Sequence, residues 1–360
     1  MAYTTIDDPT AYFQTTLYSG TGSQQSITNG GNSDLQPDWL WIKERDATSS
    51  HQLVDSVRGY YLRVESNNTS AELDAGQTGA TYQNVTSFDS DGFGVKNGGA
   101  VNESGKTYVA WNWKAGTSFT NDASATGIGT IDSTGSASTA AGFSIVSYTG
   151  TGSAGTIKHG LSSIPKMIIM KTRSTSNIWS VYHVGLGNTH YMQLNEPDTA
   201  TDNDTYWSDT TPTSSVFSVG TASGVNGNGV TNIAYCFADV QGYSKITDYL
   251  GNGDANGPYI HLGFSPAFII IKKYGSGAWN IKDNRRRTAS VSTGGNLTEA
   301  VLLANSTAAD QDANGIDFTA NGFKIKSTGG DVNTANNAYI YMAFAEEPFV
   351  ASNFNTATAR

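Results

Sequence analysis

Cysteine is almost absent from this 360-residue chain, and positive charge is scarce. The single cysteine, Cys236, excludes a disulfide within the chain, so packing must hold the fold together. Cys236 lies in the apolar run 233–237, and we interpret it as a buried small hydrophobic residue. Lys and Arg total 21 against 31 Asp and Glu, a net charge of −10. This balance argues against nucleic acid or an anionic membrane surface as a partner, because either needs a basic face.

Long apolar runs and a leader segment are also missing. No stretch approaches the ~20 apolar residues of a membrane helix, and residues 1–8 lack the basic and apolar regions of a signal peptide. We therefore expect folding in a cytoplasm without membrane insertion. Charged residues are only 14%, whereas Gly alone contributes 40 residues and Ser, Thr and Asn are plentiful. This composition predicts an all-β protein with many turns.

The usual catalytic constellations are not recognisable. The five histidines show no His-Glu-x-x-His spacing, and no Gly-x-Ser-x-Gly precedes a predicted helix. With 31 acidic residues, no carboxylate pair stands out as a glycosidase pair. We expect no catalytic residue, no metal site and no cofactor, and we predict that the protein is not an enzyme.

One pattern occurs three times in the chain. Each copy opens with Tyr-x-Gly-x-Gly, continues with a proline and an apolar run, and has a lysine six positions after the proline. The residues that define the copies are Tyr18, Pro37 and Lys43, then Tyr148, Pro165 and Lys171, then Tyr249, Pro266 and Lys272. The fixed spacing predicts three structural units of one design, with these residues in structural roles.

The repeated run has the properties of a central strand. Proline fits best at the first residue of a strand, and the run after it is apolar on both alternations, as in 267–271. Such a strand is covered on both faces, and we expect the lysine to mark its exit into solvent. Trp179 and Trp279 follow the lysine by about eight residues and are predicted to cap the core.

These patterns predict tandem β-sandwich-like domains. A Gly/Ser/Thr-rich stretch separates the first unit from the second and is interpreted as a linker or arm with little core of its own. No flexible joint fits between the second and third units, so they should pack as one rigid body. The predicted boundaries are 1–116, the linker 117–141, the second unit 142–241, the third unit 242–350 and a tail 351–360.

The second unit contains an acidic segment that the others lack. Asp202 and Asp204 are followed directly by Tyr206 and Trp207. Calcium is conceivable because it prefers oxygen ligands, although an exposed, solvated loop fits the order of residues better. Aromatic rings beside acidic and amide side chains can stack on sugar rings, so these four residues are candidate ligand contacts; core packing of the two rings is an equal alternative. The cluster 285–287 of three arginines is interpreted as a local interface or salt-bridge site.

The copies resemble a repeat found in virion proteins of tailed bacteriophages, especially marine phages of cyanobacteria. The motifs that carry the resemblance in the third unit are 242–245, 249–253, 263–272, 321–324 and 339–346, and those in the first are 37–43, His51, 55–59 and 108–116. Members of this family are described as tail fibres, tail-associated proteins or virion structural proteins. The resemblance implies a virion location, synthesis in the host cytoplasm and other virion proteins as partners, and it carries no catalytic residues.

Three functions are consistent with these observations. The first is a non-enzymatic virion surface protein, associated with the tail or a fibre, that contacts glycans of the host surface. The second is a capsid-decorating or cement protein on the phage head. The third is a polysaccharide depolymerase built on sandwich modules. Symmetric assemblies are common among such proteins, and we expect a homo-oligomer.

Overall fold

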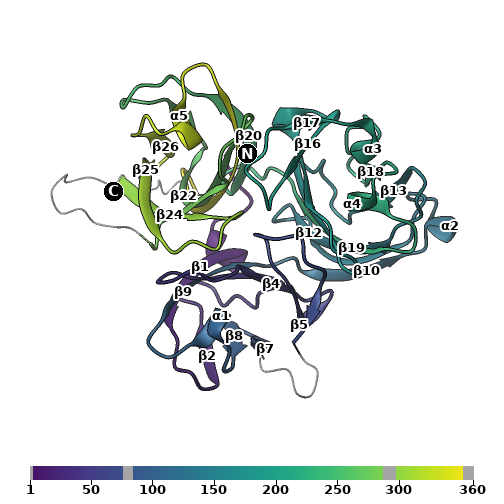
Figure 1. The fold of residues 1–360 in the computed structure, drawn as a ribbon, viewed down its shortest axis with the longest axis horizontal. Coiled ribbons are helices and arrows are strands. Elements are labelled where there is room, and N and C mark those ends of the chain that lie inside the picture. Colours follow the sequence, from purple (N-terminus) through teal and green to yellow (C-terminus); the bar gives the residue numbers. More distant parts are fainter. Residues whose placement is uncertain (1–2, 76–83, 287–296, 352–360) are drawn as a thin grey trace.

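The computed structural model describes residues 3–75, 84–286 and 297–351. These residues form an all-β fold in which three similar units surround a common centre (Figure 1). In Figure 1 the first unit lies at the bottom, the second at the right and the third at the upper left. None of the helices in the described ranges combines the length and the apolar character needed to cross a membrane.

The first unit has a six-stranded and a three-stranded sheet. A short 3-10 helix, η1 (Pro9–Ala11), leads into it, and α1 (Gly99–Asn102) precedes its closing strand. The larger sheet has the order β1 (Phe13–Ser19), β9 (Thr107–Trp113), β3 (Trp39–Glu44), β4 (Gln52–Asp55), β5 (Gly59–Val64) and β6 (Leu73–Asp74). The smaller sheet has the order β2 (Gln25–Thr28), β8 (Gly92–Val95) and β7 (Val85–Asp89).

The second unit has an eight-stranded and a two-stranded sheet. The larger has the order β10 (Thr117–Asn121), β11 (Ser133–Ser138), β12 (Phe143–Thr149), β19 (Thr231–Phe237), β14 (Met167–Thr172), β15 (Trp179–His183), β16 (His190–Gln193) and β17 (Thr201–Asp202). The smaller pairs β13 (Gly155–Lys158) with β18 (Val216–Val219). The helices are α2 (Ala123–Thr126), η2 (Val184–Leu186), α3 (Asp204–Trp207) and α4 (Ser223–Asn226).

In the third unit both layers belong to one curled sheet. Its order is β20 (Ser244–Leu250), β27 (Ala338–Pro348), β22 (Phe264–Lys273), β23 (Asn280–Asp283), β24 (Leu297–Leu303), β25 (Gln311–Thr319), β26 (Gly322–Ile325) and β21 (Tyr259–His261). The short helix α5 (Gly330–Asn333) corresponds to α1 and α4, because each precedes the closing strand of its unit.

The stretch 117–141, interpreted as a linker or arm, is part of the second unit and not a free connection between units. Two segments of this stretch are the antiparallel strands β10 and β11, which extend the second sheet beyond β12. Strands rich in Ser, Thr and Gly can form here because they lie at the edge of a sheet, where one face stays in water. The first unit is therefore not tethered at a distance. The predicted tail lies almost wholly outside the described residues, which end at 351.

The central strand of each unit is covered on both faces, as predicted. In β3, Trp39 and Trp41 enter a large core shared by all three units, whereas Leu40 and Ile42 enter a core private to the first unit. In β14 alternate side chains divide in the same way between the shared core and a private core of the second unit. The apolar character on both alternations follows from this double coverage. Pro37 and Pro165 lie two residues before their strands, whereas Pro266 lies inside β22 at an irregularity of register.

The three units close into a ring through one repeated contact. Trp179 Nε1 donates to Glu65 O at 2.9 Å, and Trp279 Nε1 donates to Gln193 O at 2.8 Å. At the corresponding position of the first unit, His51 Nε2 lies 3.0 Å from Leu303 O of the third. Each contact joins one unit to the next, so the three seams complete a circle. The tryptophans thus cap the core, as predicted, and also link the units.

The Tyr-x-Gly-x-Gly motif is a latch that holds a loop against the short helix of its unit. The tyrosine hydroxyl of each copy donates to a valine carbonyl in that helix, in the third unit from Tyr249 to Val332 at 2.7 Å. A Cβ on the first glycine, such as Gly150, would lie 2.3 Å from the backbone oxygen of Gly227. The second glycine, such as Gly152, has φ of +73°, which other residues rarely adopt. The motif is therefore explained by local structure.

Candidate functional site

The acidic segment that the sequence singled out is divided between surface and core. Asp202 and Asp204 are exposed, on β17 and in the first turn of α3. Tyr206 and Trp207 are buried in the private core of the second unit. The Tyr206 ring stacks on Tyr191 with centroids 3.6 Å apart, and Trp207 Nε1 donates to His190 O. The two rings are therefore not free to stack on a sugar, and the structure shows the alternative interpretation, core packing of the pair.

A hollow of about 340 Å³ lies beside α3. Asp204 and Asp209 line it with Thr205, Ser208 and backbone around Gly220. Within the described ranges, no three His, Cys, Asp or Glu side chains come together in a way that could hold a metal ion. The hollow therefore presents two carboxylates and several hydroxyl groups, and the rings of Tyr206 and Trp207 do not line it.

The repeat lysines are buried, which contradicts the expectation that they mark an exit into solvent. Lys43, Lys171 and Lys272 have no exposed surface. Each ammonium group donates to the carbonyl of the next residue and to a second carbonyl, in the case of Lys272 at 2.7 and 2.8 Å. Burial lowers the pKa of each of the three to about 8. A lysine can be buried here because carbonyl oxygens surround its charge.

Two of the three seams contain a buried chain of charges. Asp55 and Arg58 form an ion pair of 2.6 Å with no exposed side-chain surface. Arg58 also reaches Glu72, which receives two hydrogen bonds from Arg173 of the second unit. Tyr235 of the second unit donates to Oδ2 of Asp55, the oxygen that also accepts from Arg58 Nε. Burial alone would lower the pKa of Arg58, but the charge of Asp55 raises it above its ordinary value.

The seam between the first and third units repeats this arrangement. Asp283 and Arg286 form a fully buried pair, and Arg286 reaches Asp310, which also binds Arg45 of the first unit. Trp111 of the first unit donates to Asp283. The predicted salt-bridge role of the arginine cluster is thus confirmed for Arg286. Residue 287 lies outside the described ranges.

The remaining seam uses a neutral version of the same arrangement. His183 occupies the place of the two aspartates, at the end of β15, and Leu186 occupies the place of the two arginines. His183 Nδ1 accepts from the Gly185 N–H at 3.0 Å, and its Nε2 lies 3.2 Å from Tyr341 O of the third unit. Burial lowers the pKa of His183 to about 4, so the ring is neutral near pH 7.

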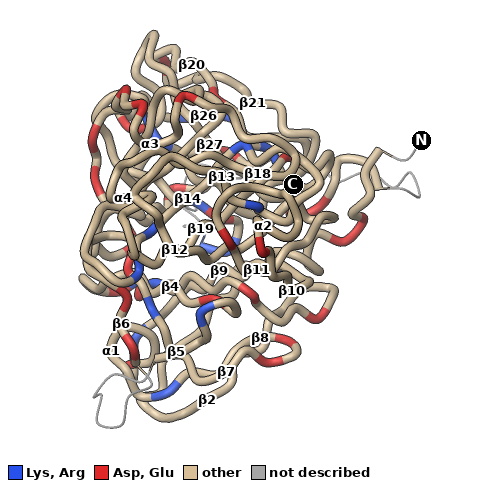
Figure 2. Tube along the Cα trace, turned by 90° about the vertical axis from the view of Figure 1, so that its right-hand side faces the viewer, with Lys and Arg blue, Asp and Glu red and all other residues tan. Residues whose placement is uncertain are grey.

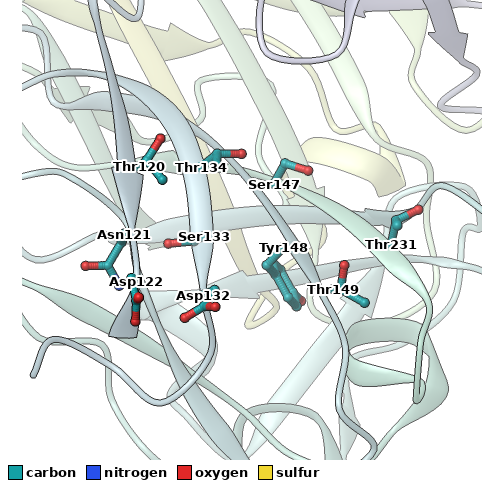
Figure 3. Close-up of a pocket in the computed structure, with 10 residues that line it drawn as sticks. All are labelled: Thr120, Asn121, Asp122, Asp132, Ser133, Thr134, Ser147, Tyr148, Thr149 and Thr231. Atoms are coloured by element: carbon teal, nitrogen blue, oxygen red, sulfur yellow. The ribbon is translucent and has the colours of Figure 1, made fainter. Parts of the chain in front are cut away.

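A polar hollow of about 270 Å³ lies on the second sheet, where β10 and β11 extend it (Figure 3). Thr120, Thr134 and Ser147 form a row across three neighbouring strands in direct register. A second row lies one alternation further along and contains Asp122, Asp132, Thr149 and Thr231. Side chains two positions apart share a face of a strand, Asp122 and Asp132 directly flank β10 and β11, and both rows line the same hollow. We call this surface the polar hollow.

Buried residues of the same strands lie between the exposed ones. Asn121, Ser133 and Tyr148, which alternate with the two rows, also line the hollow but are each less than 5% exposed. Asp132 accepts a hydrogen bond from the Ala123 N–H at 2.8 Å. Hydrogen bonds from the Ser124 hydroxyl and the Ala125 N–H lower the pKa of Asp122. Hydrogen bonds from the protein thus hold both carboxylates in place at the edge of the hollow.

Sequence reasoning missed the polar hollow because it treated its strands as a linker. The available signal was weak: segments 117–121 and 133–138 contain β-branched threonines and one phenylalanine but too few apolar residues to show the period of a strand. Figure 2 shows that acidic and basic residues are scattered along the chain and do not gather in one large region of this view. The hollow is therefore distinguished by shape and chemistry and not by an overall charge pattern.

Comparison with known families gives one match. A family model described as a domain of unknown function, DUF7483, matches residues 8–348. The chain belongs to the DUF7483 family. The match spans all three units, which agrees with a single ring built on one shared core. No curated protein matches the chain.

Proposed function

We propose that this DUF7483 protein is a non-enzymatic phage virion surface protein, associated with the tail or a fibre, that contacts glycans of the host surface. The phage assignment rests on the resemblance of the repeat motifs. The structure supports binding over catalysis through the location of its perturbed ionisable groups. Such groups often mark active sites, but here the buried lysines, histidines and the arginines 58 and 286 bind other parts of the protein itself.

A ring with a shared core is a suitable platform for binding. Its units cannot move independently without exposing apolar surface, so surface groups keep fixed relative positions. The insertion that distinguishes the second unit adds polar surface and little core. An addition of this kind contributes more to recognition than to stability.

The location of the protein in the particle is the direct test. Gold-labelled antibody against the protein should mark tails or fibres of purified particles, and mass spectrometry should give a copy number typical of a tail component. Absence from purified particles would overturn the proposal. Release of reducing sugar from host polysaccharide by the purified protein would overturn its non-enzymatic part.

One observation favours the capsid-decorating role as a second candidate. Three similar units around one axis can offer similar surfaces to three neighbouring subunits around a local threefold axis of a head shell. In that case the labelling would cover heads at high copy number, and the purified protein would bind empty heads.

A further inference from the structure

We infer that the polar hollow of the second unit binds neutral, hydroxyl-rich sugar residues. This inference rests on the proposed function, because it assigns the glycan contact to a particular surface and a particular ligand class. It concerns the two rows of side chains on β10, β11 and β12 that Figure 3 shows.

The hollow exists because of the inserted hairpin. In the first and third units, β1 and β20 are the outer strands of their sheets. The equivalent strand of the second unit, β12, carries β11 and β10 outside it. The insertion therefore creates a polar face for which the other copies have no counterpart. Its outward side chains, such as Thr120 and Thr134, are exposed and contribute nothing to a core.

The chemistry of the two rows matches that of a sugar. A hydroxyl group can donate and accept, and an ionised carboxylate accepts through two oxygens. Adjacent sugar hydroxyls can therefore donate to Asp122 or Asp132 while they exchange hydrogen bonds with the row Thr120, Thr134 and Ser147. Hydrogen bonds to a charged acceptor are the stronger ones, so the two carboxylates should contribute most of the affinity.

The electrostatics favour a neutral ligand. The residues that line the hollow, all within the described part of the chain, include two carboxylates and no Lys or Arg. Arg173 lies nearby and donates to Ser147 Oγ at 3.2 Å, but Glu72 occupies its Nε and Nη2. An acidic sugar would meet uncompensated negative charge, which disfavours its binding.

The hollow has room for more than one sugar residue. A second hollow of about 580 Å³ adjoins it and shares Asp132 and Thr149. It adds the exposed side chains of Thr151 and Asn228, an amide that can both donate and accept. The combined surface suits an oligosaccharide that extends from the first hollow into the second.

The test is titration calorimetry of the full chain with neutral gluco-, manno- and galacto-oligosaccharides, with uronic-acid oligosaccharides, and with Ca²⁺ alone. At least one neutral oligosaccharide should bind. Asp132→Asn, which keeps the acceptor for the Ala123 N–H, and Thr134→Val should each weaken that binding about tenfold or more. Asp254→Asn is the matched control, because Asp254 is exposed, lies in the third unit and likewise accepts from a backbone N–H, that of Asn256 at 2.8 Å; it should leave affinity unchanged. Urea unfolding of each variant verifies the fold.

Several outcomes would overturn the inference. These are no binding of any neutral oligosaccharide, preferential binding of the acidic ones, or binding that Asp132→Asn and Asp254→Asn weaken equally. Tight binding of Ca²⁺ alone that Asp132→Asn abolishes would identify a cation site instead. If the protein labels tails but the hollow variants bind sugar normally, this inference fails while the proposed function stands; absence from the particle would remove the proposed function independently.

Discussion

The buried pair of Asp55 and Arg58 offers a quantitative test of the seams. In Arg58→Leu the carboxylate of Asp55, which has no exposed surface, would lose its ion pair and remain buried. Breaking a buried pair by removal of one partner costs about 3–5 kcal/mol, and we expect this loss in the free energy of unfolding. Glu72 keeps its two hydrogen bonds from Arg173, so the loss should be confined to Asp55.

The second unit shows how such a seam can be stable without the ion pair. At the equivalent positions of the second unit, His183 and Leu186 form a seam without charge. The double variant Asp55→His with Arg58→Leu should therefore recover most of the lost stability, to within about 1–2 kcal/mol of the original protein. Recovery is feasible at this seam because the Tyr235 hydroxyl can accept as well as donate.

The assay is urea unfolding followed by tryptophan fluorescence, with the coupling energy taken from the double-mutant cycle. Lys166→Met is the control, because Lys166 and Asp239 form a pair with side chains 38% and 28% exposed. Its loss should cost less than about 1 kcal/mol. If Arg58→Leu destabilises the protein no more than the control does, or if the double variant is no more stable than the single one, the Asp55–Arg58 pair does not stabilise the seam as described.

Three further predictions concern pH and the latch. Burial lowers the pKa of His51 to about 3 and the pKa of His159 and of His183 to about 4. Because the unfolded chain therefore binds more protons than the folded one below pH 6.5, the stability measured by thermal unfolding should fall from pH 6.5 to pH 4. A stability that does not change over this range would contradict the prediction. The lysines with pKa about 8 should make stability rise from pH 8 to 10, and Lys272→Met should reduce that slope in urea titrations at each pH. Asn226 in α4 bonds the backbone of Thr151 in the latch, of Ser153 just after it and of Gly220. Asn226→Ala should therefore lower the unfolding free energy by about 2–4 kcal/mol in the same titration, against no change if the latch is dispensable.

Sequence patterns predicted those parts of the fold in which local chemistry decides the structure. The run at 267–271 indicated a strand covered on both faces, and β22 is such a strand, paired on both edges and buried. The pattern does not indicate which residues pack against each face of the strand. In the equivalent strand β3, for example, Trp39 and Trp41 pack in a core that also contains residues of the other two units. Local periodicity cannot identify such partners, because they are distant in the sequence.

The errors also have physical reasons. Lysine is rarely buried, and only the arrangement of carbonyls around Lys272 reveals why it can be. Tyr206 and Trp207 follow exposed acids directly, but the one turn of α3 rotates their rings into the core. The strands 117–121 and 133–138 need only one covered face, so their composition resembles a linker.

Differential scanning calorimetry tests the central claim that three copies form one ring around a shared core. Because residues of all three units enter that core and each seam joins consecutive units, we expect a single unfolding transition. Its calorimetric and van't Hoff enthalpies should agree for the whole chain. Two or three separate transitions, each with the enthalpy of about one unit, would show independent tandem domains and contradict the account.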